Sequence, residues 1–273
     1  MNNAAIGVFD SGVGGLTCVK ELTALMPHEN VVYLGDTARV PYGTRSRETI
    51  ARYTHQDIEF LKRHDVKMIL VACGTASSAI MYDPEFTKEH GEIKLSGVVI
   101  PAAHAACAAT KNGRIGIIAT SATIKSCSYV KAIREIMPEA KVFGKACPMF
   151  VPLVENGYTS PDCPPARFFT EEYLECMKRE QVDTLILGCT HYPHLTQVIS
   201  EYMGREVTLI SSGAELAKYA LKTLTYDGEL ADREEQGELE LYCTDSVDLF
   251  SESVERFLGK TINGEISKCS LKL

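Results

Sequence analysis

The sequence has no excess of positive charge and no long apolar run, and each absence excludes a class of protein. The net charge is −8, which argues against nucleic acid or an anionic membrane as a partner, because phosphate binding depends on clustered Lys and Arg. No apolar run approaches the length needed to span a bilayer. Residues 1–6 have no basic region before an apolar core, so we expect no signal peptide and a cytoplasmic protein.

The cysteines also lack a pattern. Ten are scattered along 273 residues and none forms a C-x-x-C pair. In a chain of this size without a secretory signal, such cysteines indicate reduced thiols rather than a disulfide framework.

What is present is a regular alternation of apolar, β-branched runs with amphipathic stretches, in a chain that is 45% hydrophobic and 23% charged. One helix is predicted at residues 47–63 and another after Asp245, a candidate N-cap. Alternating strands and helices favour parallel sheets covered on both faces. We predict strands at residues 6–9, 31–34, 67–72, 96–100, 115–119, 141–145, 183–188, 206–210 and 239–243.

A weak internal repeat suggests that the chain has two similar halves. IGVFDSG at residue 6 is similar to IGIIATS at residue 115, VPYG at 40 to VPLVENG at 151, and MILVACGT at 68 to TLILGCTH at 184. The blocks keep their order and nearly their spacing. We therefore predict an α/β fold of two similar parallel-sheet domains, related by a pseudo-twofold axis, with the active site in the cleft between them.

Cys73 and Cys189 are the most informative single residues. Each ends an apolar strand and begins a polar turn, CGTASS at residue 73 and CTHYPH at residue 189. A buried cysteine is usually a small hydrophobic residue. At a strand end that leads into a helix, however, a thiol can become reactive, because a helix N-terminus or a nearby imidazolium lowers its pKa.

Two glycine-containing loops accompany the cysteines. DSGVGG, residues 10–15, is either a tight strand-to-helix turn or an anion cradle, and it matches neither common nucleotide-binding glycine motif. GDTARVPYG, residues 35–43, is either a surface loop or a rim that offers backbone N–H groups and the Tyr42 hydroxyl. Asp36 could sit behind a site residue.

Two other interpretations of Cys189 remain open. Cys189, His191 and His194 could bind zinc, but their spacing, interrupted by Pro193, fits no common zinc pattern, and we expect no metal. A Cys189–His191 nucleophile pair would make the protein a cysteine hydrolase. That interpretation leaves the matched Cys73 unexplained.

Taken together, the blocks FDSGVGGL, LGDTARVPYG, VACGTAS, VPLVE and LGCTHYP resemble the glutamate racemases of the aspartate/glutamate racemase superfamily. The resemblance implies a cofactor-independent isomerase that interconverts L- and D-glutamate for peptidoglycan synthesis, with no nucleic-acid or membrane partner and as a homodimer. It also implies that the chain after Ser211 returns to the first domain. The expected domains are then 1–97 plus 211–273, and 98–210.

The resemblance also assigns residues. Cys73 and Cys189 match the two catalytic cysteines, of which the first acts on D-glutamate and the second on L-glutamate. Glu155 and His191 are expected to tune Cys189, and Asp10 and Asp36 to tune the Cys73 side. The substrate-binding positions match Asp10, Ser11, Tyr42, Gly43, Gly74, Thr75, Thr190 and His191.

Paired cysteines suit racemisation because a proton must leave one face of Cα and another must arrive on the opposite face. Thiols serve both steps, since their pKa can be brought towards neutrality. Gly74 departs from the family, which commonly has Asn there, and this departure keeps an aspartate racemase open as an alternative. A racemase-like binding protein without activity is a further alternative, although the presence of both cysteines argues against it.

Overall fold

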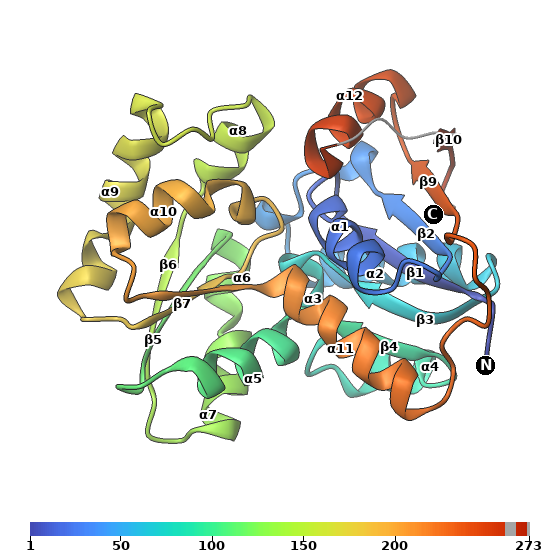
Figure 1. Ribbon diagram of the computed structural model, residues 1–273, viewed down its shortest axis with the longest axis horizontal. Helices are drawn as coiled ribbons and strands as arrows, with labels where there is room; N and C mark the ends of the chain where they lie inside the picture. The colour runs from blue at the N-terminus through green and yellow to red at the C-terminus, as the bar shows by residue number, and fades with distance from the viewer. Residues whose placement is uncertain (260–265, 272–273) are drawn as a thin grey trace.

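The structure, a computed structural model, describes residues 1–259 and 266–271 and contains two parallel β-sheets with helices around them (Figure 1). The first sheet has six strands in the order β10-β9-β2-β1-β3-β4. Its strands are β1 (Ala5–Asp10), β2 (Val31–Gly35), β3 (Val66–Val71), β4 (Lys94–Gly97), β9 (Leu239–Cys243) and β10 (Ile266–Lys268). All of its pairings are parallel.

The second sheet has four strands in the order β6-β5-β7-β8, again all parallel. They are β5 (Arg114–Ala119), β6 (Lys141–Ala146), β7 (Thr184–Leu187) and β8 (Thr208–Ser211). This order repeats that of β2-β1-β3-β4, so the sequence blocks that look alike occupy equivalent strands in the two sheets. The predicted α/β class with two parallel sheets is confirmed, and β9 and β10 extend only the first sheet.

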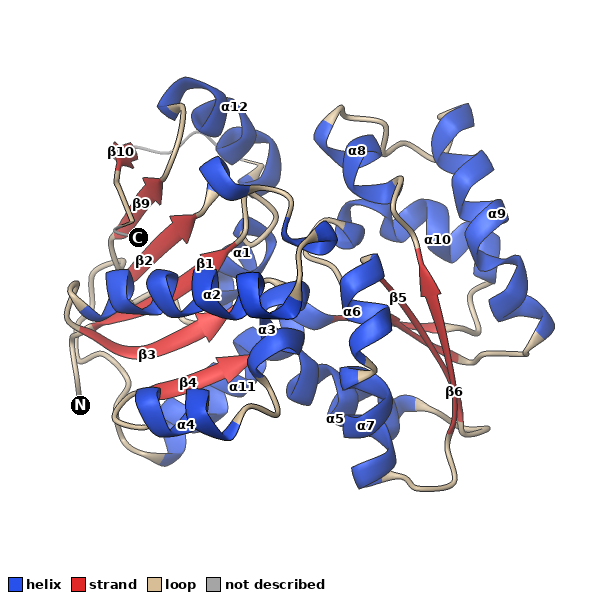
Figure 2. Cartoon of the chain, turned by 180° about the vertical axis from the view of Figure 1, so that it is seen from behind, coloured by secondary structure: helices blue, strands red, loops and turns tan. Residues whose placement is uncertain are grey.

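Helices cover both faces of the first sheet because its central strands are apolar on both sides. Ile6 and Val8 of β1 belong to a core that continues into the second half of the chain, whereas Phe9 points into a separate core with Ile58 and Leu61. Figure 2 shows α2, which carries Ile58 and Leu61, in front of the sheet.

The helices have the following bounds. They are α1 (Leu16–Leu25), α2 (Arg47–Lys62), α3 (Gly74–Ile80), α4 (Pro84–His90), α5 (Val99–Ala109), α6 (Ser121–Ser126), α7 (Ser128–Ile136), α8 (Phe150–Glu155), α9 (Pro164–Arg179), α10 (Thr196–Met203), α11 (Ser212–Tyr226) and α12 (Val247–Leu258). Short 3₁₀ turns lie at Thr37–Arg39, Tyr42–Thr44 and Tyr192–Leu195. Within the described residues, none of the helices has the length and apolar character needed to cross a bilayer.

The chain passes from one sheet to the other twice. It leaves the first sheet at β4, continues through α5 to β5, and returns after β8 through α11, which packs against α5 (Figure 1). The predicted boundaries at 97/98 and 210/211 fall at these two passages. As limits of independently folding domains they stay a prediction.

Three local predictions need correction. The strand predicted at 96–100 ends at Gly97, and Val99 already begins α5. The N-cap of α12 is Ser246 rather than Asp245, because the Ser246 side chain accepts the N–H of Leu249. The three-residue edge strand β10 was not predicted.

Candidate active site

The predicted site residues follow the central strands of both sheets. In each sheet, chain order reverses between two neighbouring strands, β1 and β3 or β5 and β7, and ligands bind at such points in open parallel sheets. Cys73 follows β3 and Cys189 follows β7, and both line one cavity of about 370 Å³. The other predicted residues that line it are Asp10, Ser11, Tyr42, Gly43, Gly74, Thr75, Glu155, Thr190 and His191.

Cys73 lies in a buried environment without a basic partner. It is 5% exposed and forms the N-cap of α3, where its Sγ accepts the N–H of Ala76 at 3.5 Å. Its thiol faces the Ser11 hydroxyl at 3.5 Å. Burial, followed by the charge of Asp10, raises the pKa of Cys73 to about 12. Cys73 is therefore a thiol when the cavity is empty.

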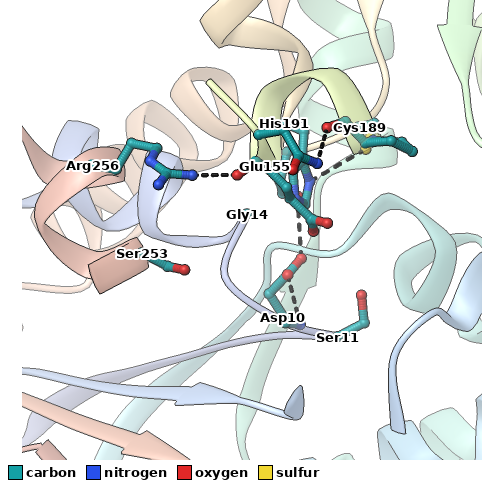
Figure 3. Close-up of polar contacts among 12 residues, drawn as sticks. Asp10, Ser11, Gly14, Glu155, Cys189, His191, Ser253 and Arg256 are labelled. Atoms are coloured by element: carbon teal, nitrogen blue, oxygen red, sulfur yellow. Dashed lines mark hydrogen bonds and ion pairs between the residues drawn. The ribbon is translucent and has the colours of Figure 1, made fainter. Parts of the chain in front are cut away.

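Cys189 has a basic partner instead. Its Sγ lies 3.9 Å from His191 Nδ1, and His191 Nε2 lies 3.1 Å from Glu155 Oε1 (Figure 3). Burial alone would lower the pKa of His191, but the hydrogen bonds to Cys189 and Glu155 raise it to about 10. The Cys189 sulfur thus lies beside an imidazolium that Glu155 holds in place.

Helix α12 supports this pair from the end of the chain. The Arg256 guanidinium donates a hydrogen bond to the main-chain carbonyl of Glu155 (Figure 3). The Phe257 ring lies 5.4 Å from the His191 ring and 4.5 Å from the His194 ring, between centroids, edge-on in both cases. An element of the first sheet's half thus packs directly against the imidazole of the second.

The loop after β1 also reaches across the cleft. Asp10 accepts hydrogen bonds from Gly12 N–H at 2.9 Å and from the Thr190 hydroxyl at 3.3 Å (Figure 3). A Cβ at Gly14 would lie 2.2 Å from Thr190 Oγ1 and 2.5 Å from His191 Nδ1. Only glycine at this position lets the loop approach the Thr190–His191 pair so closely.

The position of Asp36 requires a correction. Asp36 does not line the cavity, and its contacts are with Tyr42, Arg39 and Thr244 rather than with Cys73. The Tyr42 hydroxyl donates to Asp36 and lies 3.0 Å from Asp57. The hydroxyl therefore faces two buried carboxylates, and Asp36 holds the loop that brings Tyr42 and Gly43 to the cavity.

Gly74 lies where the two halves of the chain meet. A Cβ at this position would lie 2.3 Å from the carbonyl oxygen of Gly188. The two halves are in contact at this point, so a side chain at residue 74 requires a local shift of the backbone.

Several cavity residues were not predicted, although the repeat contained the signal. Thr120 and Ser121 follow β5 much as Ser11 follows β1, and Thr120 Oγ1 lies 2.9 Å from Thr75 Oγ1. Among the described residues that line the cavity, none is Lys or Arg. The other lining residues are Gly12, Val40, Pro41, Thr44, Pro148, Val151, Pro152, Gly188 and Tyr192.

His194 does not join the site. Its ring turns towards Phe257, it does not line the cavity, and burial followed by the charge of His191 lowers its pKa to about 4. In the described part of the chain, the one group with the geometry of a metal site lies elsewhere, at His55, Glu89 and His90. Cys189, His191 and His194 therefore do not make one ligand set.

Two thiols at equivalent strand ends of a duplicated α/β fold face one cavity from opposite halves, an arrangement that suits acid–base chemistry on both sides of a bound molecule. The model of the Asp/Glu/Hydantoin racemase family matches residues 16–220. The chain is 44% identical over 268 residues to a glutamate racemase of Geobacter metallireducens, covering 98% of this chain and 97% of the relative. The chain belongs to the Asp/Glu/Hydantoin racemase family.

Solved structures agree with this assignment over the whole chain. A glutamate racemase isoform of Bacillus anthracis has a TM-score of 0.92 and 38% identity, with 100% of both chains covered. The glutamate racemase of Francisella tularensis, solved in complex with D-glutamate, has a TM-score of 0.89 and 33% identity, with 99% of both chains covered.

Proposed function

We propose that this protein is an isomerase that interconverts L- and D-glutamate by two-base proton transfer through Cys73 and Cys189, and so supplies D-glutamate for peptidoglycan. The observation that carries the proposal is the convergence of both thiols, one from each half of the fold, on a single cavity. The similarity to glutamate racemases over nearly the full chain supports glutamate as the substrate.

The proton balance follows from the two thiol environments. With L-glutamate bound, the Cys189 thiolate takes the Cα proton, and the Cys73 thiol delivers its own proton to the opposite face. The product is D-glutamate, with a thiol at Cys189 and a thiolate at Cys73. D-glutamate reacts by the same steps in reverse. Cys73 is protonated in the empty site, as the first half of this cycle requires.

Neutral donors would hold the substrate carboxylates. The Ser11, Thr75 and Thr190 hydroxyls line a cavity to which no described Lys or Arg contributes. Donors arranged in advance stabilise charge that develops at Cα and the adjoining carboxylate without the cost of reorganising water. The Asp10 carboxylate in the same cavity suits the substrate ammonium.

The deciding experiment follows rotation of polarised light in L- and D-glutamate and in L- and D-aspartate, with no added cofactor and after dialysis against EDTA. We expect racemisation of glutamate in both directions. A preference of about tenfold or more for aspartate in kcat/KM, roughly 1.4 kcal/mol, would identify an aspartate racemase. No turnover of either amino acid, together with hydrolase activity that needs Cys189 alone, would sink the proposal.

Two predictions about the setting of the enzyme accompany this function. A homodimer is expected, and sedimentation velocity at several protein concentrations measures it. A cytoplasmic location is expected, and fractionation of the producing cells measures that.

A further inference from the structure

A second cluster of ionisable side chains lies apart from the catalytic cavity. His55 belongs to α2, and Glu89 and His90 end α4. One ligand atom from each lies within 4.8 Å of the other two. His55 Nδ1 is 3.1 Å from His90 Nε2 and 3.4 Å from Glu89 Oε1. Two rings and a carboxylate thus converge on one point between two helices.

These distances match ligands that share one ion. Two ligand atoms bound about 2.0–2.1 Å from a tetrahedral cation lie roughly 3.3–3.4 Å apart. A hydrogen bond between the rings accounts for the contact of His55 with His90. The Glu89 carboxylate lies 3.4 Å from the same His55 Nδ1, so one potential ligand atom from each of the three residues gathers there.

The far side of the His90 ring is arranged as in metal-binding histidines. His90 Nδ1 is buried and has no hydrogen-bond partner among the described residues, and it lies 3.6 Å from Glu59 Oε1. Lys62 holds that carboxylate at 2.8 Å. A histidine that binds a cation through one nitrogen usually directs its other N–H at a carboxylate, which fixes the tautomer and the ring. Glu59 is the carboxylate nearest to His90 Nδ1, at a distance of 3.6 Å that is longer than a hydrogen bond, and His90 Nε2 remains as the ligand atom.

The burial of the His90 side chain and the solvent access to the cluster are also compatible with a bound ion. The His90 side chain is fully buried and packs against Phe86, with 4.6 Å between ring centroids, so its position is fixed. The His55 and Glu89 side chains are 36% and 58% exposed, so solvent reaches the side of the cluster opposite the buried His90 ring.

We propose that His55, Glu89 and His90 bind one divalent transition cation, Zn²⁺ or a cation of similar ligand preference, with water completing the coordination. Two imidazoles and one carboxylate favour such ions over Mg²⁺ and Ca²⁺, which prefer oxygen ligands alone. The ion joins α4 to α2 on the outside of the first sheet. It takes no part in proton transfer, so EDTA leaves racemisation intact.

The test titrates metal-free, reduced protein with Zn²⁺ by calorimetry and with Co²⁺ by visible absorption. We expect one saturable site with nitrogen and oxygen ligands. His55→Ala should weaken binding at least 100-fold, and Glu59→Gln about 10–100-fold through the His90 ring. His104→Ala, which removes an exposed imidazole on α5, is the matched control and should bind as the wild type does.

A measurement of thermal stability distinguishes Zn²⁺ binding at this site from binding by cysteine thiols and from a loss of folding in the variants. Zn²⁺ should raise the Tm of the wild type and of His104→Ala but not that of His55→Ala, because only a ligand of the folded state stabilises it. Equal binding by both histidine variants, a thiolate charge-transfer band with Co²⁺, or no saturable binding would each overturn the proposal. None of these results bears on racemisation, which is assayed separately.

Discussion

Cys73 and Cys189 occupy equivalent strand ends but lie in different environments. Cys73 has a hydroxyl and a backbone amide beside its sulfur, whereas Cys189 has an imidazole that is held in turn by Glu155. Duplication of the fold explains the matching positions. Among the described residues, an imidazolium faces the Cys189 sulfur and none faces Cys73, whose pKa is raised by burial. One fold thus supplies an acid on one side and a base on the other.

Thermodynamics limits how the difference between the two cysteines can appear in the kinetics. L- and D-glutamate have equal free energies, so kcat/KM must be the same in both directions in every variant. Differences between the two cysteines can appear only in kcat and KM taken separately, or in isotope effects. The predictions below are built on that limit.

The largest effect is expected from removing either thiol. Cys73→Ala and Cys189→Ala should each lower kcat/KM by about 10⁴-fold or more in both directions, because each direction uses both residues and a single acid–base group contributes about 10²–10⁴-fold. Polarimetry on each enantiomer measures this. Near-normal turnover in Cys73→Ala, together with no activity in Cys189→Ala, would contradict this prediction. It would favour the interpretation as a cysteine hydrolase in which Cys189 is the single nucleophile.

Replacement by serine should separate the two sides. A hydroxyl is a far poorer base than a thiol but can still donate a proton, so we expect a loss of about 10²–10⁴-fold. In Cys73→Ser the primary isotope effect with Cα-deuterated substrate should rise for D-glutamate and fall for L-glutamate. Cys189→Ser should show the reverse. Changes in the same direction in both variants would contradict the stereochemical assignment.

A smaller effect is expected where the two halves touch. Gly74→Ala should lower the free energy of unfolding by about 1–3 kcal/mol, because its Cβ meets the Gly188 carbonyl and overpacking strains the backbone. Gly74→Asn should lower the free energy of unfolding by at least as much. Gly144→Ala is the control, since its Cβ would meet Ile124 at an ordinary 3.5 Å. Urea unfolding measures the free energy of unfolding of the Gly74 variants and of the control. Equal values for Gly74→Ala and Gly144→Ala would show that the contact between the two halves can open at no cost.

The smallest effect is expected from the charge on His191. Its pKa is raised from 6.5 to about 10 in the folded protein, so its contribution to stability is complete below pH 6.5 and is lost as pH rises through about 10. The difference in unfolding free energy between wild type and His191→Gln should therefore shrink between these pH values. A difference that stays constant across this range would mean that the imidazole is neutral throughout.

The strands and the cavity were largely predictable because apolar runs end in polar turns at equivalent points of a repeat. Thr120 and Ser121 were not predicted because a Thr-Ser pair is not by itself typical of an active site. The repeat contained the signal, since it aligns residues 115–121 with the block that contains Ser11. The orientation of Tyr42 and the contact at Gly74 depend on distant residues, Asp57 and Gly188. Neither partner can be found from local sequence, because tertiary packing brings them together. β10 is too short for an alternating pattern to identify it.

The first sheet joins strands from both ends of the chain, and this has a consequence for synthesis. β2 pairs with β9, yet the roughly 140 residues between β4 and β9 take on the order of ten seconds to translate. During that interval β2 presents an open edge, whereas β5 to β8 are continuous in sequence and can pair as soon as residue 211 has emerged. An unpaired edge is a template for association with other chains. The nascent polypeptide is therefore most prone to aggregate just before its last strands leave the ribosome.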